Sequence, residues 1–220
     1  MIDQPEWLAR SLELLLKGGP VMMVLLAVSV VALAIILVKW GQFARAGLRN
    51  TRFVEPAVDA LGRGDREAAT TTLRRARHPA ARVMEAAIRA AANPRLSADD
   101  RDAEIGRVGT AEIRNLESYL RGLEVIANLS PLLGLLGTVL GMIEAFAELE
   151  AAGSKVDPAL LAGGIWEALL TTAFGLVIAI PALAAFYLFE GRVDGVRAAM
   201  KDGVTRVLGH VLPSRQAAAA

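Results

Sequence analysis

The chain has 220 residues, with 24 Lys and Arg against 23 Asp and Glu, and a net charge of +1. This balance excludes the strongly basic surface that nucleic-acid binding needs, so we expect no nucleic-acid partner. Hydrophobic residues make up 54% of the chain, above the roughly 45–50% of soluble domains. The chain has no cysteine, which excludes disulfides, cysteine zinc sites and thiolate nucleophiles. Its two histidines are far apart, so we expect no metal site.

A charge-free run covers residues 18–38, and about 20 apolar helical residues are enough to cross the hydrocarbon layer. Lys39 and Trp40 follow it, and a tryptophan at this place is typical of an interfacial anchor. We expect a periplasmic N-terminal segment at 1–17 and a first transmembrane helix at 18–40. The first segment contains acidic residues, so a retained span is favoured over a cleaved signal peptide.

Residues 41–124 form the expected cytoplasmic region. Ala and Arg are abundant there and no alternating β-branched run occurs, which predicts helices. Asp65 is a candidate N-cap, Pro79 can open the next helix, and Asn93 precedes a proline that stops it. Ser97 begins a capping box. The composition thus predicts a bundle of short helices.

A longer helix is expected to follow Ser97. Its apolar positions recur at spacings of three and four: Ile105, Val108, Ile113, Leu116, Leu120, Leu123 and Ala127. No proline or glycine pair interrupts this face before Val125, so we expect it to continue straight into the second span. Its charged residues predict a solvated face, with partner docking as the alternative. His78, among arginines, is expected in a solvated loop.

Two further apolar stretches follow. We expect a second transmembrane helix at 125–147 and a short periplasmic connection at 148–158. A third transmembrane helix is expected at 159–189 and a cytoplasmic tail at 190–220. The predicted fold is therefore all-α: a polytopic membrane protein with three transmembrane helices, two of them extended into a cytoplasmic helical bundle.

The distribution of basic residues predicts the orientation. Residues 39–124 hold 16 Lys and Arg, whereas residues 144–167 hold one, together with five acids. Cytoplasmic loops of membrane proteins carry the excess of Lys and Arg. We therefore expect a cytoplasmic C-terminus and an N-terminus on the opposite side of the membrane.

Small residues recur at helical spacing in the second and third spans. In lipid, such residues let helix backbones approach closely. We expect an oligomer interface at Gly137 and Gly141, and a proline in the third span that frees a backbone carbonyl. The predicted helix-packing residues are Gly134, Gly137, Gly141, Gly175, Ala179 and Pro181.

Polar side chains are few within the spans. An intramembrane acid is a candidate functional group by default, and Glu167 is either a hydrated interfacial acid or a pore-lining one. Each threonine hydroxyl can bond its own helix backbone or face a pore, and the candidates are Thr138, Thr171 and Thr172. No paired carboxylates, phosphate loop or Ser/His/Asp arrangement occurs, so no catalytic residue and no enzyme activity are expected.

Three stretches carry a resemblance to a known family: residues 131–142 (PLLGLLGTVLGM), 163–177 (GGIWEALLTTAFGLV) and 179–182 (AIPA). They resemble the MotA/TolQ/ExbB proton-channel family, and within it the chain looks most like ExbB. The resemblance covers about 80 residues. By motif position, it implies polar pore-facing places for Thr138, Glu167 and Thr172, while Thr171 is an extra hydroxyl.

The resemblance also implies the assembly. It implies a multi-pass protein of the bacterial inner membrane with a periplasmic N-terminus. It also implies a homopentamer around two helices of an ExbD/TolR-like single-span partner, with protons as the coupling ion and no other cofactor. Work would pass to a TonB-like protein that energises outer-membrane transport. The alternatives are a TolQ-like role in envelope maintenance and, from a different class, a passive membrane scaffold. A flagellar stator is disfavoured because that branch normally has four spans.

Overall fold

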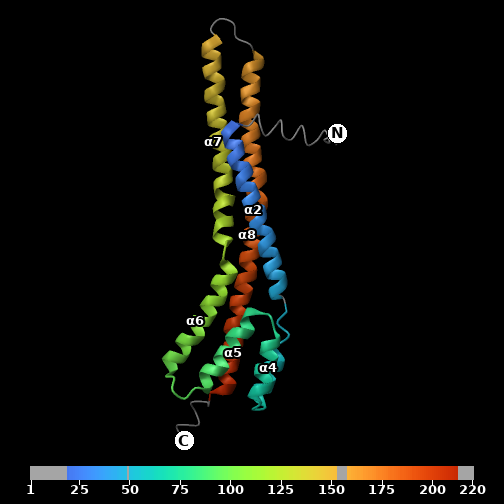
Figure 1. Cartoon of the computed structure of the whole chain (residues 1–220), viewed down its shortest axis with the longest axis vertical. Coiled ribbons are helices and arrows are strands. Elements are labelled where there is room, and N and C mark those ends of the chain that lie inside the picture. The colour runs from blue at the N-terminus through green and yellow to red at the C-terminus, as the bar shows by residue number, and fades with distance from the viewer. Residues whose placement is uncertain (1–18, 49, 153–157, 213–220) are drawn as a thin grey trace, which may run out of the picture. The chain divides into compact units, whose positions relative to one another are not determined.

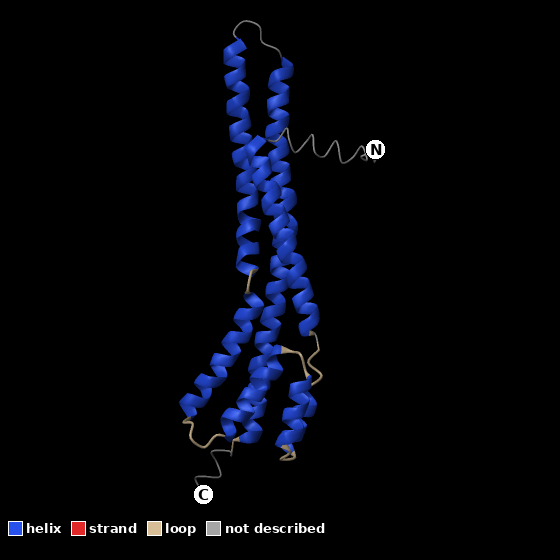
Figure 2. Ribbon diagram, in the orientation of Figure 1, coloured by secondary structure: helices blue, strands red, loops and turns tan. Residues whose placement is uncertain are grey.

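The computed structural model describes residues 19–48, 50–152 and 158–212, and every regular element in these ranges is a helix (Figures 1 and 2). The expected all-α fold is confirmed. The expected segment 1–17 lies outside the described residues, as do residues 153–157 of the connection expected at 148–158. The helices are α2 (Gly19–Ala46), α3 (Val54–Gly62), α4 (Arg66–Arg75), α5 (Pro79–Ala92), α6 (Ala98–Glu117), α7 (Leu120–Ala152) and α8 (Pro158–Val211).

Three stretches of helix are long and apolar enough to cross a membrane, as the sequence predicts. They are Gly19–Ala46, Ala98–Ala151 and Leu161–Val211. The second stretch includes both α6 and α7. The chain is thus polytopic, with α2, α7 and α8 as its membrane helices.

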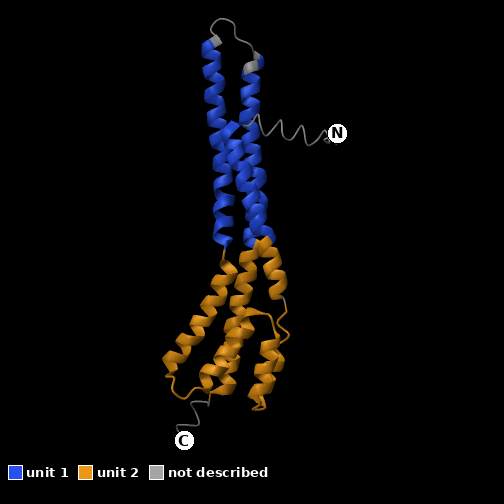
Figure 3. Cartoon of the chain, viewed as in Figure 1, with its two compact units in different colours: residues 1–37, 119–187 blue, residues 38–118, 188–220 orange. Residues whose placement is uncertain are grey.

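The chain divides into two compact units (Figure 3). The first contains residues 1–37 and 119–187, and so holds α7 with the adjoining parts of α2 and α8. Many of its large apolar side chains are exposed, among them Val30, Leu132 and Leu169 at 62%, 59% and 60%. Exposed apolar surface of this extent needs lipid or another helix to cover it.

The second unit, residues 38–118 and 188–220, is a helical bundle around α5. Met84 of α5 is fully buried and its sulfur would lie 2.7 Å from a Cβ atom added at Gly203 of α8. Phe43 of α2 packs edge-on against Phe189 of α8, with ring centroids 5.3 Å apart. Both α2 and α8 therefore continue from the first unit into this bundle.

The predicted helix boundaries in this bundle are confirmed. The Asp65 carboxylate accepts a hydrogen bond from the Ala68 amide, 2.9 Å away, at the start of α4. Pro79 is the first residue of α5, which ends just before Asn93. The Ser97 hydroxyl accepts from the Asp100 amide at the start of α6, 3.1 Å away. Each side chain satisfies an amide that has no partner within its own helix.

Two predictions are wrong. The helix after Ser97 is not continuous: α6 ends at Glu117, and Tyr119 has a φ of 64° before α7 begins. His78 is not a solvated loop residue, since it is only 2% exposed. Its Nδ1 accepts from the Ala80 amide and its Nε2 lies 3.2 Å from the Leu48 carbonyl oxygen. The ring is therefore a buried N-cap of α5.

Candidate functional site on α7 and α8

Helices α7 and α8 approach each other closely along a line of small residues. A Cβ atom added at Gly134 would lie 2.9 Å from the Thr171 carbonyl oxygen, and one added at Gly175 would lie 2.5 Å from the Ser130 carbonyl oxygen. One added at Gly141 would lie 3.3 Å from the Cβ of Ala168. Only glycine allows backbones this near, so the two helices pack backbone to backbone.

This packing changes the interpretation of the glycines in the second span. We expected Gly137 and Gly141 at an interface between copies of the chain. The structure instead places both against α8 of the same chain. The other small residues predicted for packing, Ala179 and Pro181, also lie in α8, and Ala179 is buried at 6% exposure.

Two threonine hydroxyls of α8 donate to the same backbone carbonyl of α7. The Thr172 hydroxyl lies 3.1 Å from the Gly134 oxygen, and the Thr171 hydroxyl lies 3.3 Å from it. Thr171 also donates to the Ala168 carbonyl of its own helix at 2.7 Å. Thr171 is 2% exposed, whereas Thr172 is half-buried. Thr171 is therefore held between the helices, and Thr172 is at the edge of their contact.

Glu167 lies near the start of α2 and is half-buried. A Cβ atom added at Gly19 would be 3.4 Å from its Oε1 oxygen. Glu144 and Glu148 of α7 are near enough to interact with it electrostatically. The three carboxylates, Glu144 and Glu148 on α7 and Glu167 on α8, thus make this end of the first unit acidic.

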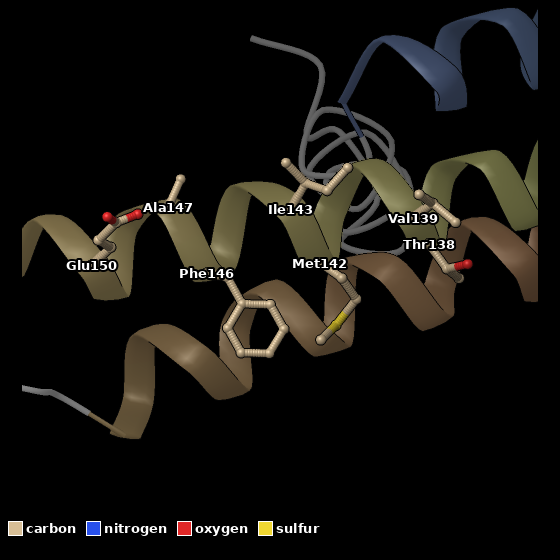
Figure 4. Close-up of a pocket in the computed structure, with 7 residues that line it drawn as sticks. All are labelled: Thr138, Val139, Met142, Ile143, Phe146, Ala147 and Glu150. Carbon is tan, nitrogen blue, oxygen red and sulfur yellow. The ribbon is translucent and has the colours of Figure 1, made fainter.

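Thr138 faces a different side of α7. Its hydroxyl donates to the Leu135 carbonyl of its own helix at 2.6 Å. An open groove of about 600 Å³ runs along α7. Figure 4 shows Thr138 at one end of the row of side chains that line it. The groove is lined by Thr138, Val139, Met142, Ile143, Phe146, Ala147 and Glu150. It is mostly apolar, with one hydroxyl and one carboxylate.

The structure therefore brings together some of the predicted polar residues and separates others. Thr171 and Thr172 share the Gly134 carbonyl, while Thr138 bonds within its own helix. Glu167 lies five residues before Thr172, about 7.5 Å along the helix axis. The hydroxyls and the one carboxylate of a single chain thus lie at several different positions along α7 and α8.

Sequence reasoning missed other residues of this contact. Ser130 is fully buried on α7, and its hydroxyl donates to the Ile126 carbonyl at 2.7 Å. Ala145 lies 2.5 Å from a Cβ atom added at Gly164. Ser130 and Ala145 continue the spacing of three and four residues of the glycines between them. A search that includes serine and alanine with glycine as small residues would therefore predict both.

Hydroxyls and a carboxylate on apolar, membrane-length helices define a class of protein: a polytopic membrane protein with polar groups inside its spans. Residues 75–202 match the MotA/TolQ/ExbB proton channel family, and the chain belongs to that family. It is a multi-pass inner-membrane protein and is most like ExbB among the family's branches.

Curated relatives agree with this assignment. The Synechocystis protein named putative biopolymer transport protein ExbB-like 1 is 33% identical over 84% of this chain and 74% of its own length. Biopolymer transport protein exbB1 of Vibrio cholerae is 46% identical over 41% of this chain. The Tol-Pal system protein TolQ of Haemophilus influenzae is 41% identical over 39% of this chain. The matches span only 40% and 37% of these last two relatives.

Proposed function

We propose that the chain is an ExbB-like proton-channel subunit of an inner-membrane motor. In this proposal it uses the proton-motive force, with an ExbD-like single-span partner, to energise TonB-dependent transport across the outer membrane. Protons are the coupling ion and no other cofactor takes part. The observation that carries the proposal is the set of polar groups on α7 and α8, Thr138, Glu167 and Thr172, at the family's polar motif positions.

The geometry of these groups supports a pore shared between chains. Thr138 lines an open groove on α7 that α8 of the same chain leaves uncovered. Thr172 is half-buried at the edge of the α7–α8 contact. Inside lipid, a hydroxyl or carboxylate offers hydrogen bonds that the hydrocarbon cannot. A homopentamer around the partner's helices would turn such groups toward a common interior.

Two exposed aromatic residues support a membrane position for α8. Trp166 and Tyr187 are each 60% exposed and lie 21 residues apart on this helix. At about 1.5 Å per residue they are about 31 Å apart along the axis, close to the roughly 30 Å thickness of the hydrocarbon layer. Aromatic residues gather at both interfaces. In this proposal Glu167 lies at one interface and Thr172 about 7.5 Å deeper.

A TolQ-like role in envelope maintenance is the second candidate, because the Haemophilus TolQ protein is 41% identical over its matched 85 residues. Complementation separates the two roles. The chain, expressed with its own partner gene, is placed in one host lacking its ExbB-type genes and in another lacking its TolQ-type genes. Our proposal expects restored TonB-dependent iron uptake in the first host and continued detergent sensitivity in the second. The opposite pattern would assign the TolQ-like role.

A further inference from the structure

Lys39 is a fully buried lysine that the proposed proton pathway does not use. It is 0% exposed, although it was expected only as a charge flanking the first span. Its Nζ donates to the Leu116 carbonyl and to the Gln42 side-chain oxygen, each at 2.8 Å, and to the Ser118 hydroxyl at 3.2 Å. A buried ammonium needs such partners, and here all three of its N–H groups have one.

Two of the groups that accept from Lys39, the Leu116 carbonyl and the Ser118 hydroxyl, lie at the end of α6. The helix is interrupted there before α7 begins. Lys39 bonds the carbonyl of Leu116, and the Gln42 amide donates to the carbonyl of Asn115 at 3.2 Å. The Ser118 hydroxyl also donates to Asn115, at 2.8 Å. These carbonyls belong to the last turn of a helix, whose carbonyls lack partners within the helix. Side chains of α2 thus cap α6.

The same carbonyls would have other partners if α6 and α7 were one helix. In a continuous helix the carbonyl of residue i accepts from the amide of residue i+4. Asn115 would then accept from Tyr119, and Leu116 from Leu120. The caps from Lys39 and Gln42 therefore occupy the acceptors that a continuous helix needs.

The local sequence favours the continuous helix. Residues 113–121 contain neither glycine nor proline, the two residues that most often end a helix. The break instead requires Tyr119 to adopt a φ of 64°, a left-handed conformation that is sterically unfavourable for a residue with a Cβ atom. Tyr119 is 67% exposed, so burial of its ring does not compensate for this strain. The caps that Lys39 and Gln42 of α2 provide can offset it.

We propose that Lys39 and Gln42 form a latch that holds the α6–α7 joint broken, with a continuous α6–α7 helix as the alternative state. The joint is one of three places where the chain passes between its two compact units, and α2 and α8 pass through the other two as unbroken helices. The latch therefore acts at the one crossing between the two units that no continuous helix spans. This inference does not depend on the proposed proton pathway.

Paired spin labels on the full-length chain test the latch. The chain has no cysteine, so Asp102→Cys and Asn128→Cys, both at exposed positions, label α6 and α7 alone. The chain is reconstituted in lipid nanodiscs and diluted with unlabelled chain, so that distances within one chain dominate. A continuous helix places these positions, 26 residues apart, about 39 Å apart, and any break shortens that distance.

We expect Lys39→Met to move the main distance peak toward 39 Å, because it keeps the apolar stem and removes the donors. Adding Tyr119→Gly should return the peak to its original position, because glycine adopts positive φ without strain. Lys201→Met, on the exposed surface of α8, is the matched control and should leave the peak unmoved.

Two results would overturn the latch: an unchanged distance distribution in Lys39→Met, or a shift that Tyr119→Gly fails to reverse. If Lys39→Met does not insert, Gln42→Met is the milder variant. It should shift part of the population in the same direction, and no shift in that variant also refutes the proposal.

Discussion

A Cβ atom added at Gly137 of α7 would lie 2.5 Å from the Thr171 hydroxyl oxygen of α8. This distance is far below an ordinary contact, so the two helices cannot keep their spacing with any larger residue at position 137. The pairing of α7 with α8 in one chain therefore depends on glycine at this position.

Gly137→Ala is expected to destabilise the chain by about 1–3 kcal/mol, the usual cost of overpacking. Unfolding in mixed micelles, followed by circular dichroism, measures the change. Gly163→Ala is the matched control, because no atom lies within 4 Å of a Cβ added there, and it should be neutral or slightly stabilising. Equal stability of the two variants would show that the close contact does not exist.

The two threonines that share the Gly134 carbonyl should differ in their contribution. Thr172→Val is expected to cost about 0.6 kcal/mol and at most about 1.7 kcal/mol, the mean and the maximum for hydrogen bonds between membrane helices. Thr171→Val should cost less, because the shorter bond of its hydroxyl, at 2.7 Å, is to its own helix. The same unfolding assay compares them, and a larger loss in Thr171→Val would contradict the hydrogen-bond pattern.

His78 should make the stability of the helical bundle in the second unit depend on pH. Burial lowers the pKa of its imidazole, although the hydrogen bond to the Leu48 carbonyl acts in the opposite direction. The unfolded chain therefore binds this proton more readily than the folded chain. The stability from neutral His78 is complete above about pH 6.5 and decreases as the pH falls below it, by at most about 1.4 kcal/mol per pH unit.

Denaturant unfolding between pH 7.5 and 5.5, followed by circular dichroism, measures this dependence, whose slope should not exceed about 1.4 kcal/mol per pH unit. His78→Asn keeps an N-cap acceptor but does not titrate, so its stability should depend less on pH than that of the parent chain. Identical pH profiles for the two would exclude His78 as the source.

Cysteine labelling tests the orientation. The contrast in basic residues predicts that Arg75→Cys is cytoplasmic and Lys155→Cys periplasmic. In intact cells an impermeant maleimide should label Lys155→Cys alone, and both should react after the cells are opened. Labelling of Arg75→Cys in intact cells would reverse the topology.

Periodicity and composition predict most of the fold, because apolar length and helix caps are local properties. Asp65, Pro79 and Ser97 act through residues at most four positions away, and each prediction is confirmed. The break at Tyr119 is different. The side chains that cap the end of α6 there, Lys39 and Gln42, lie more than 70 residues earlier, so no local pattern indicates these caps.

The candidate site is predicted only in part for a similar reason. Small residues in two spans indicate close helix contacts, yet they do not tell whether the partner is another span or another copy. Gly137 and Gly141 face α8 of the same chain. His78 shows the same limit, because its burial follows from the Leu48 and Phe53 contacts of the folded bundle rather than from its neighbours in sequence.

Proton flux tests the central claim most directly. The chain and its ExbD-like partner are reconstituted in vesicles with an internal pH dye, and flux is measured under an imposed membrane potential. We predict flux that requires both chains and that falls about tenfold or more in Thr138→Val/Thr172→Val, a change in barrier of about 1.4 kcal/mol, while assembly is preserved. A passive scaffold would give no flux in any sample. If the double variant assembles normally and retains full flux, these threonines serve packing only and the polar-pore assignment is contradicted.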